Sequence, residues 1–112
     1  MDSELPALKA DLFRALAHPT RIRILELLVD RACTVQDISG ALGLDQPVAS
    51  QHLAALRARH LVTVRREGTL AHYALRSRLV ADLLRVAREF LNRSLTDSQT
   101  MLRELRRQDR RS

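Results

Sequence analysis

The chain has 112 residues, a length that accommodates one domain of ordinary size. Its 46% hydrophobic and 29% charged residues are typical of a folded globular protein and argue against disorder, collagen or a membrane span. No apolar run approaches the ~20 residues that a membrane-spanning helix needs. A single cysteine, Cys33, excludes an internal disulfide framework, and the acidic N-terminus is unlike a signal peptide, so we expect a reduced, cytoplasmic protein.

The net charge is +6, and the basic residues are concentrated in one part of the chain. Residues 46–78 contain six arginines and a single acidic residue, whereas residues 1–45 contain more acidic than basic side chains. Such a positive segment indicates a polyanionic partner. Aromatic residues make up only 3% of the chain, too few for a domain that stacks single-stranded bases, so double-stranded DNA is the favoured polyanion.

Two helices are predicted at the start of the chain. Leucines recur at helical spacing from Leu5 to Leu16, which predicts an amphipathic helix over residues 5–17. Pro19 suits the first turn of a new helix, which is predicted to run to about residue 29. This second helix is so rich in Ile, Leu and Val that we expect it to be the central buried one.

A helix-turn-helix is predicted over residues 34–59. Thr34 followed by Asp37 is a capping-box pattern, and Gly43 marks the end of the helix that this pattern opens. After a short turn, Asp45 is the expected cap of a second helix, which completes the segment. This joint would hold the second helix away from the body of the protein, as entry into a major groove requires.

The pattern then changes to the alternation that is typical of strands. Two alternating segments flank the turn residues Glu67-Gly68-Thr69, which predicts a two-stranded β-hairpin over residues 61–75. A long helix follows from residue 78. A second capping pattern, Thr96-Asp97-Ser98-Gln99, predicts a separate last helix from about residue 97 to 107, with one continuous helix as the alternative.

This order of elements indicates a mostly helical α+β fold, a single winged helix-turn-helix domain over residues 1–112. The core positions of its helices hold Ile, Leu and Val rather than the carboxylates or histidines of a helical-bundle enzyme. The sequence has no catalytic triad, phosphate-binding glycine loop or zinc-protease motif, so we expect a DNA-binding protein and not an enzyme. A protein-assembly module is the alternative, but its surface would be more apolar than the predicted face around Gln51.

Three motifs resemble one known family. Residues 16–25 (LAHPTRIRIL), residues 46–56 (QPVASQHLAAL), and Arg66-Glu67-Gly68 with His72-Tyr73-Ala74-Leu75 resemble the ArsR/SmtB family of small repressors, over roughly residues 5–91. The resemblance implies a homodimer that occupies an operator and releases it when an effector binds. It also implies that the first and last helices, residues 5–17 and 78–107, pair across the two-fold axis. The residues expected at this dimer interface are Leu5, Leu8, Leu12, Leu83, Leu84, Phe90 and Leu91.

The expected DNA contacts fall into three groups. The candidates for base contacts lie in the first two turns of the recognition helix, away from its apolar face: Gln46, Val48, Ser50, Gln51 and His52. The candidates for phosphate contacts are Thr34, Gln36, Arg57 and Arg59. The candidates on the hairpin, for the minor groove or the backbone, are Arg65, Arg66 and Thr69. Two such helices in a dimer predict an operator that is an imperfect inverted repeat, with half-sites about 34–36 Å apart.

Many members of this family sense metals, and the resemblance indicates two places where their ligands would lie. The side chains at these places are Thr34 and Gln36 in the first and Ser77, Leu79, Phe90 and Arg93 in the second. Such side chains cannot make a metal site, so no cofactor is predicted and the usual metal sites are expected to be missing. The alternative is a divalent transition metal (nickel, zinc or cobalt) as effector, at a non-standard site that includes Cys33 or His60.

Overall fold

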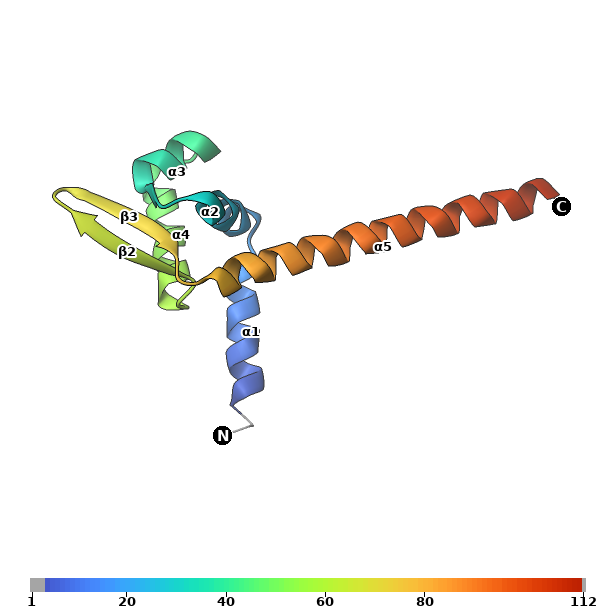
Figure 1. Ribbon diagram of the computed structural model, residues 1–112, viewed down its shortest axis with the longest axis horizontal. Coiled ribbons are helices and arrows are strands. Elements are labelled where there is room, and N and C mark those ends of the chain that lie inside the picture. The colour runs from blue at the N-terminus through green and yellow to red at the C-terminus, as the bar shows by residue number, and fades with distance from the viewer. Residues whose placement is uncertain (1–3, 112) are drawn as a thin grey trace. The chain divides into compact units, whose positions relative to one another are not determined.

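The computed structural model describes residues 4–111, which form five helices and three strands (Figure 1). The chain divides into two compact units, one that ends at Ala81 and one that begins at Asp82. The first unit contains all three strands and four complete helices. None of the helices formed by the described residues has both the length and the apolarity of a membrane-spanning segment.

The first two helices agree with the sequence prediction to within one residue at each end. Helix α1 covers Leu5–Leu16 and helix α2 covers Pro19–Asp30. His18, between them, is extended (φ −136°), and Pro19 occupies the first turn of α2, where its missing N–H costs no hydrogen bond. Helix α2 contacts α1, α3, α4 and β3, which confirms it as the central helix.

Helices α3 (Val35–Leu42) and α4 (Gln46–Ala58) form the predicted helix-turn-helix. The capping box is present: the Asp37 backbone N–H donates to Thr34 Oγ1 (3.1 Å), and the Thr34 backbone N–H donates to Asp37 Oδ2 (3.0 Å). Gly43 then ends α3 in the left-handed conformation (φ 66°), which glycine adopts without steric cost. Asp45 occupies the predicted cap position of α4, but its side chain makes no capping hydrogen bond to the described residues.

The hairpin is formed by β2 (Val62–Glu67) and β3 (Leu70–Leu75), which pair antiparallel. Gly68 in the connecting turn has a φ of 60°, the positive value that the first central residue of a type II′ turn requires. A third strand, β1 (Cys33–Thr34), pairs with the other edge of β3 and gives the strand order β1-β3-β2. The sequence predicted only two strands, because a two-residue strand has no alternation to detect.

The core of the first unit lies where α2, α3, α4 and β2 meet. Its largest fully buried side chains are Ile24, Leu25, Ile38, Leu53, Leu56, Val62 and Cys33. The inner face of α4, which consists of Ala49, Leu53 and Leu56, is completely buried. Burial of this apolar face fixes α4 on the body and leaves its opposite face in solvent.

The C-terminal region is one continuous helix, α5 (Arg78–Arg111), so the prediction of a separate helix from residue 97 was wrong. Thr96 Oγ1 donates to the backbone oxygen of Asn92 one turn earlier (2.9 Å), a bond made inside a helix rather than at a cap. Residues 79–112 contain neither glycine nor proline to interrupt the helix.

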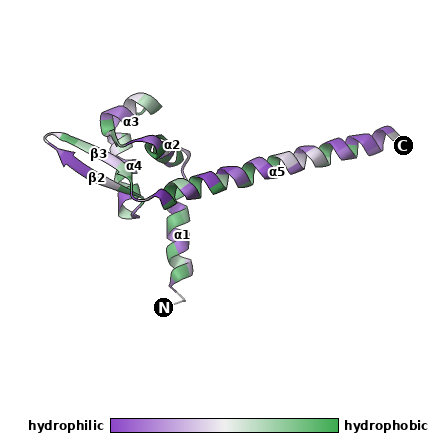
Figure 2. Ribbon diagram, in the orientation of Figure 1, coloured by the Kyte–Doolittle hydropathy of each residue, from purple (hydrophilic) through white to green (hydrophobic). Residues whose placement is uncertain are grey.

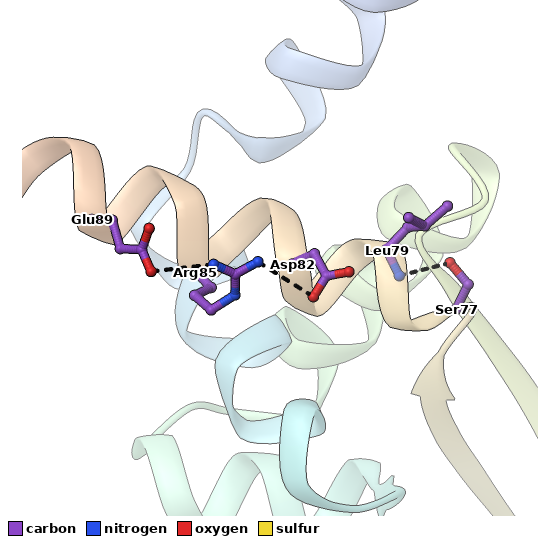
Figure 3. Close-up of polar contacts among 5 residues, drawn as sticks. All are labelled: Ser77, Leu79, Asp82, Arg85 and Glu89. Atoms are coloured by element: carbon purple, nitrogen blue, oxygen red, sulfur yellow. Dashed lines mark hydrogen bonds and ion pairs between the residues drawn. The ribbon is translucent and has the colours of Figure 1, made fainter.

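Polar contacts support the start and the exposed surface of α5 (Figure 3). Ser77 Oγ, just before the helix, accepts from the Leu79 backbone N–H (3.2 Å). Arg85 pairs with Asp82 (3.8 Å) on the preceding turn and with Glu89 (3.2 Å) on the following turn. Polar and apolar residues alternate around the helix along its length (Figure 2).

Candidate nucleic-acid interface

The N-terminal half of α4 presents polar side chains to solvent. Gln46, Ser50 and Gln51 are exposed, and Val48 beside them is 39% exposed. At the helical period, Gln51 lies opposite the buried face of the helix, and the other three lie to its sides. The structure therefore leaves free four of the five side chains that the sequence placed in contact with bases.

The fifth, His52, is half-buried and bonded inside the protein. Its Nδ1 accepts a hydrogen bond from Arg21 Nε (3.2 Å), and its ring centroid is 6.1 Å from that of His18. Burial lowers the pKa of His52, and the charges of Arg21 and His18 lower it further. His52 is therefore neutral at physiological pH, as the hydrogen bond to Nδ1 requires, and it links α4 to the first turn of α2.

The start of α3 differs from expectation at one of its two candidate residues. Thr34 is only 8% exposed and its hydroxyl caps the helix, whereas Gln36 is exposed. Hydrogen bonds from Thr34, chiefly from its backbone N–H, hold the pKa of Asp37 below its usual value. At this position only Gln36 is free for the phosphate contact that the sequence assigned to both residues.

The arginines of the candidate interface differ in their surroundings. Arg57 and Arg66 are exposed. Arg59, at the end of α4, lies 3.7 Å from the Asp11 carboxylate of α1. Arg65 pairs with Glu67 (3.3 Å) on the same strand.

The wing residues lie on both faces of the hairpin. Arg65 is opposite His72 and Arg66 is opposite Ala71 in the register of β2 and β3. Because neighbouring residues of a strand point to opposite faces, the two arginines point away from each other. Thr69 is exposed in the turn at the tip of the hairpin.

Both units expose apolar side chains that the sequence assigned to a dimer interface. Of these residues, Leu5, Leu8, Phe90 and Leu91 are exposed, and Leu12, Leu83 and Leu84 are partly exposed. Other large apolar side chains that the sequence analysis did not assign to this interface are also exposed: Phe13, Leu79, Val86, Leu95, Met101, Leu102 and Leu105. The continued helical spacing of leucines beyond residue 91 was the sequence signal for Leu95, Leu102 and Leu105.

The two residues named for a non-standard metal site have separate environments. Cys33 is 1% exposed, and its thiol donates to the backbone oxygen of Arg31 (3.7 Å). His60 is exposed and ends α4 in the left-handed conformation (φ 60°). Among residues 4–111, no three His, Cys, Asp or Glu side chains lie close enough together to hold a metal ion.

The sequence is similar to those of bacterial transcriptional regulators. A family model described as "Bacterial regulatory protein, arsR family" matches residues 18–64. The HTH-type transcriptional regulator Rv0081 of Mycobacterium tuberculosis is 45% identical over 108 residues, which cover 95% of each chain. A probable mercury resistance operon repressor of Streptomyces lividans is 36% identical over 83 residues, 74% of this chain and 66% of that protein.

Solved structures show the same architecture. The crystal structure of Rv0081 from M. tuberculosis matches with a TM-score of 0.79 over 83% of this chain and 94% of that one. The solution structure of Mb0332 from Mycobacterium bovis, described as a homodimeric winged helix-turn-helix DNA-binding domain, matches with a TM-score of 0.76 and 33% identity, over 80% of this chain and 83% of that one.

Proposed function

The chain belongs to the ArsR family of DNA-binding transcriptional regulators, and we propose that it is a homodimeric repressor that reads its operator with the exposed face of α4. Its relatives are regulators and not enzymes, in agreement with the expectation from the sequence. We place its action in the cytoplasm, where bacterial operator DNA is found.

The observation that carries this proposal is the two-sided character of α4. One face is completely buried, which holds the helix rigidly, and the other presents hydrogen-bonding side chains. Gln46, Ser50 and Gln51 suit base edges in a major groove, and Val48 suits a thymine methyl group. Arg57, Gln36 and the wing residues Arg65, Arg66 and Thr69 then supply contacts to phosphates or to the adjacent minor groove.

The exposed apolar surfaces of α1 and α5 support the proposal of a homodimer. Large apolar side chains are exposed along both helices, for example Phe90, which is 69% exposed. A monomeric protein rarely exposes so many of them. The described homodimer of the M. bovis relative supports the same assembly. Two recognition helices related by a two-fold axis require an operator that is an imperfect inverted repeat, with half-sites about 34–36 Å apart.

We propose that the effector is not a metal ion at the positions that other family members use. Thr34 is buried in a helix cap and Gln36 is an amide, so the start of α3 offers no thiolate. Ser77, at the second of the two locations where relatives hold a metal, caps α5. The alternative, a metal-responsive repressor, would use the buried Cys33 or the exposed His60.

The test compares a base-contact residue with a phosphate-contact residue. Gln51→Ala should weaken binding to an operator selected from random duplexes by about 1–3 kcal/mol, with little change on non-specific DNA. Arg66→Ala should weaken binding to both and reduce the slope of the salt dependence by about one. Fluorescence anisotropy across a salt series measures both effects.

Arg23→Ala, at an exposed arginine on α2 outside the interface, is the matched control and should change neither quantity. An equal loss on both DNAs after Gln51→Ala would show that α4 does not read bases.

A further inference from the structure

An open pocket of about 440 Å³ lies in the first unit, between the end of α1, the start of α2 and the second half of α4. Its lining residues are Asp11, Arg14, Ala15, His18, Arg21, Ala55, Ala58 and Arg59. The DNA-binding surface proposed above uses none of them, although the sequence analysis named Arg59 as a candidate for a phosphate contact.

The pocket has an excess of positive charge. Its lining contains three arginines and a single carboxylate, that of Asp11, which lies 2.6 Å from Arg14 Nη1 and 3.7 Å from Arg59 Nη1. One carboxylate compensates one of these guanidinium groups, so two positive charges face the pocket uncompensated by its lining.

Arg21 is held in place by uncharged partners. Its Nε donates to His52 Nδ1 and its Nη1 donates to the backbone oxygen of Ala15, both at 3.2 Å. Neither acceptor carries a negative charge. Among residues 4–111, Arg21 Nη2 has no hydrogen-bond or ion-pair partner, so a positioned guanidinium edge is available for a ligand.

The rest of the wall is small and apolar. Ala15 of α1 and Ala55 and Ala58 of α4 have only a methyl side chain, which leaves the space open and gives a hydrocarbon group a surface to contact. The pocket thus combines a fixed cationic edge with an apolar wall.

We propose that this pocket binds a small organic anion, with a carboxylate or phosphate group on the arginines and a short apolar part on the alanines. Arginine binds both groups through paired hydrogen bonds. Because α4 supplies Ala55, Ala58 and Arg59 as well as the recognition surface, occupancy changes the affinity for DNA, and the anion is the effector. This second step depends on the proposed function, whereas binding of the anion does not.

Calorimetry on the full-length protein at constant ionic strength tests the first step. The probes are inorganic phosphate, succinate and benzoate, with uncharged benzamide as the control for benzoate. At least one anion should bind with a dissociation constant below about 1 mM, and benzamide should not bind. Failure of all three anions to bind, or equal binding of benzamide and benzoate, would overturn the proposal.

Two substitutions in the pocket should change the affinity for the anion in opposite directions. They distinguish a specific anion site from general attraction by the positive surface. Arg14→Gln removes one donor from a side chain that is 74% exposed, so the fold should persist and anion affinity should fall about tenfold. Asp11→Asn removes the internal competitor for Arg14 and Arg59 and should tighten binding, a gain that unfolding cannot produce. Arg23→Gln makes the same charge change on α2 outside the pocket. If it weakens binding as much as Arg14→Gln does, the site does not exist.

Anisotropy of a labelled operator, with and without the anion, tests the second step. The wild type should change its operator affinity about tenfold when the anion is present, and Arg14→Gln should lose this response. If the wild type binds no DNA, the proposed function fails while the calorimetry still decides the anion site. If Arg14→Gln weakens DNA binding but leaves anion binding intact, the arginines contact DNA phosphates, and the small-anion proposal is wrong.

Discussion

The hydrogen bond between Arg21 and His52 connects the central helix of the fold to the helix that carries the candidate base contacts. It requires His52 to be neutral, because Nδ1 can accept only when it carries no proton. Burial of the ring lowers the pKa of His52 below the value of about 6.5 that an unfolded chain provides. The unfolded state therefore binds more protons than the native state in mildly acidic solution, and the contribution of His52 to stability is lost progressively as the pH falls from about 6.5 through the lower pKa of the native state.

His52→Asn should flatten the pH dependence of stability. Asparagine offers an uncharged acceptor near the position of Nδ1 and does not titrate, so the free energy of unfolding should fall less than in the wild type between about pH 7.5 and 5.5. Urea denaturation at the two pH values measures the difference. The control is His60→Asn, where asparagine also tolerates the left-handed backbone. An unchanged slope in His52→Asn would contradict the argument.

At the scale of elements, the sequence was informative where a local signal exists. Thr34 and Asp37 form their capping box, and Gly43 ends α3, because both features depend on residues within one turn of each other. Strand β1 depends instead on pairing between Cys33 and Tyr73, forty residues apart, which no local pattern shows. The capping pattern at Thr96 has the correct local form, yet α5 continues through it, so a cap signal alone does not break a helix.

In the candidate site, too, the sequence predicted features that depend on local spacing and missed contacts between distant residues. Helical period alone separates the exposed Gln51 from the buried Leu53. It cannot show that His52, on the border between the two faces, meets Arg21 of another helix. Nor can it show that Asp11 and Arg59, far apart in the chain, form an ion pair.

Two glycines, one inside α3 and one directly after it, should respond oppositely to the same substitution. Gly43→Ala places a Cβ on a backbone with φ 66° and should destabilise the protein by about 1–2 kcal/mol, although space is free around it. Gly40→Ala, inside α3 and also surrounded by free space, should stabilise the protein by roughly 0.5–1 kcal/mol. Thermal or urea denaturation of both variants decides the matter, and a change of the same sign in both would show that the turn conformation is described wrongly.

At the scale of the whole molecule, the apolar surface points to self-association. The first unit exposes leucines of α1, and the second unit exposes a stripe of large apolar side chains that continues to Leu105. Covering these side chains removes them from water, at about 25 cal/mol for each Å² of apolar surface. A second copy of the chain provides the same surface and is the simplest partner.

Leu83→Asp combined with Leu84→Asp should convert the dimer to a monomer. Two carboxylates in an apolar interface cost several kcal/mol, so sedimentation should give a mass near the 12.7 kDa of one chain and operator binding should be lost. Gln99→Asp with Thr100→Asp adds the same charges at exposed polar positions of the same helix and should leave the dimer intact. Circular dichroism checks that the helices remain. A wild-type mass of one chain at micromolar concentration would contradict the homodimer.

Because the Cys33 thiol is buried in the sheet, its chemical labelling can report local opening of the sheet without any added probe. Cys33 is the only cysteine, is 1% exposed and lies in the strand that pairs with β3. An alkylating reagent attacks the thiolate, so it reacts only when β1 separates from its neighbours. The rate of labelling therefore measures how often that edge of the sheet opens, in the same way that amide exchange measures the opening of a backbone hydrogen bond. Because β1 leads directly into α3, the same rate reports how firmly the helix-turn-helix is held to the body of the protein.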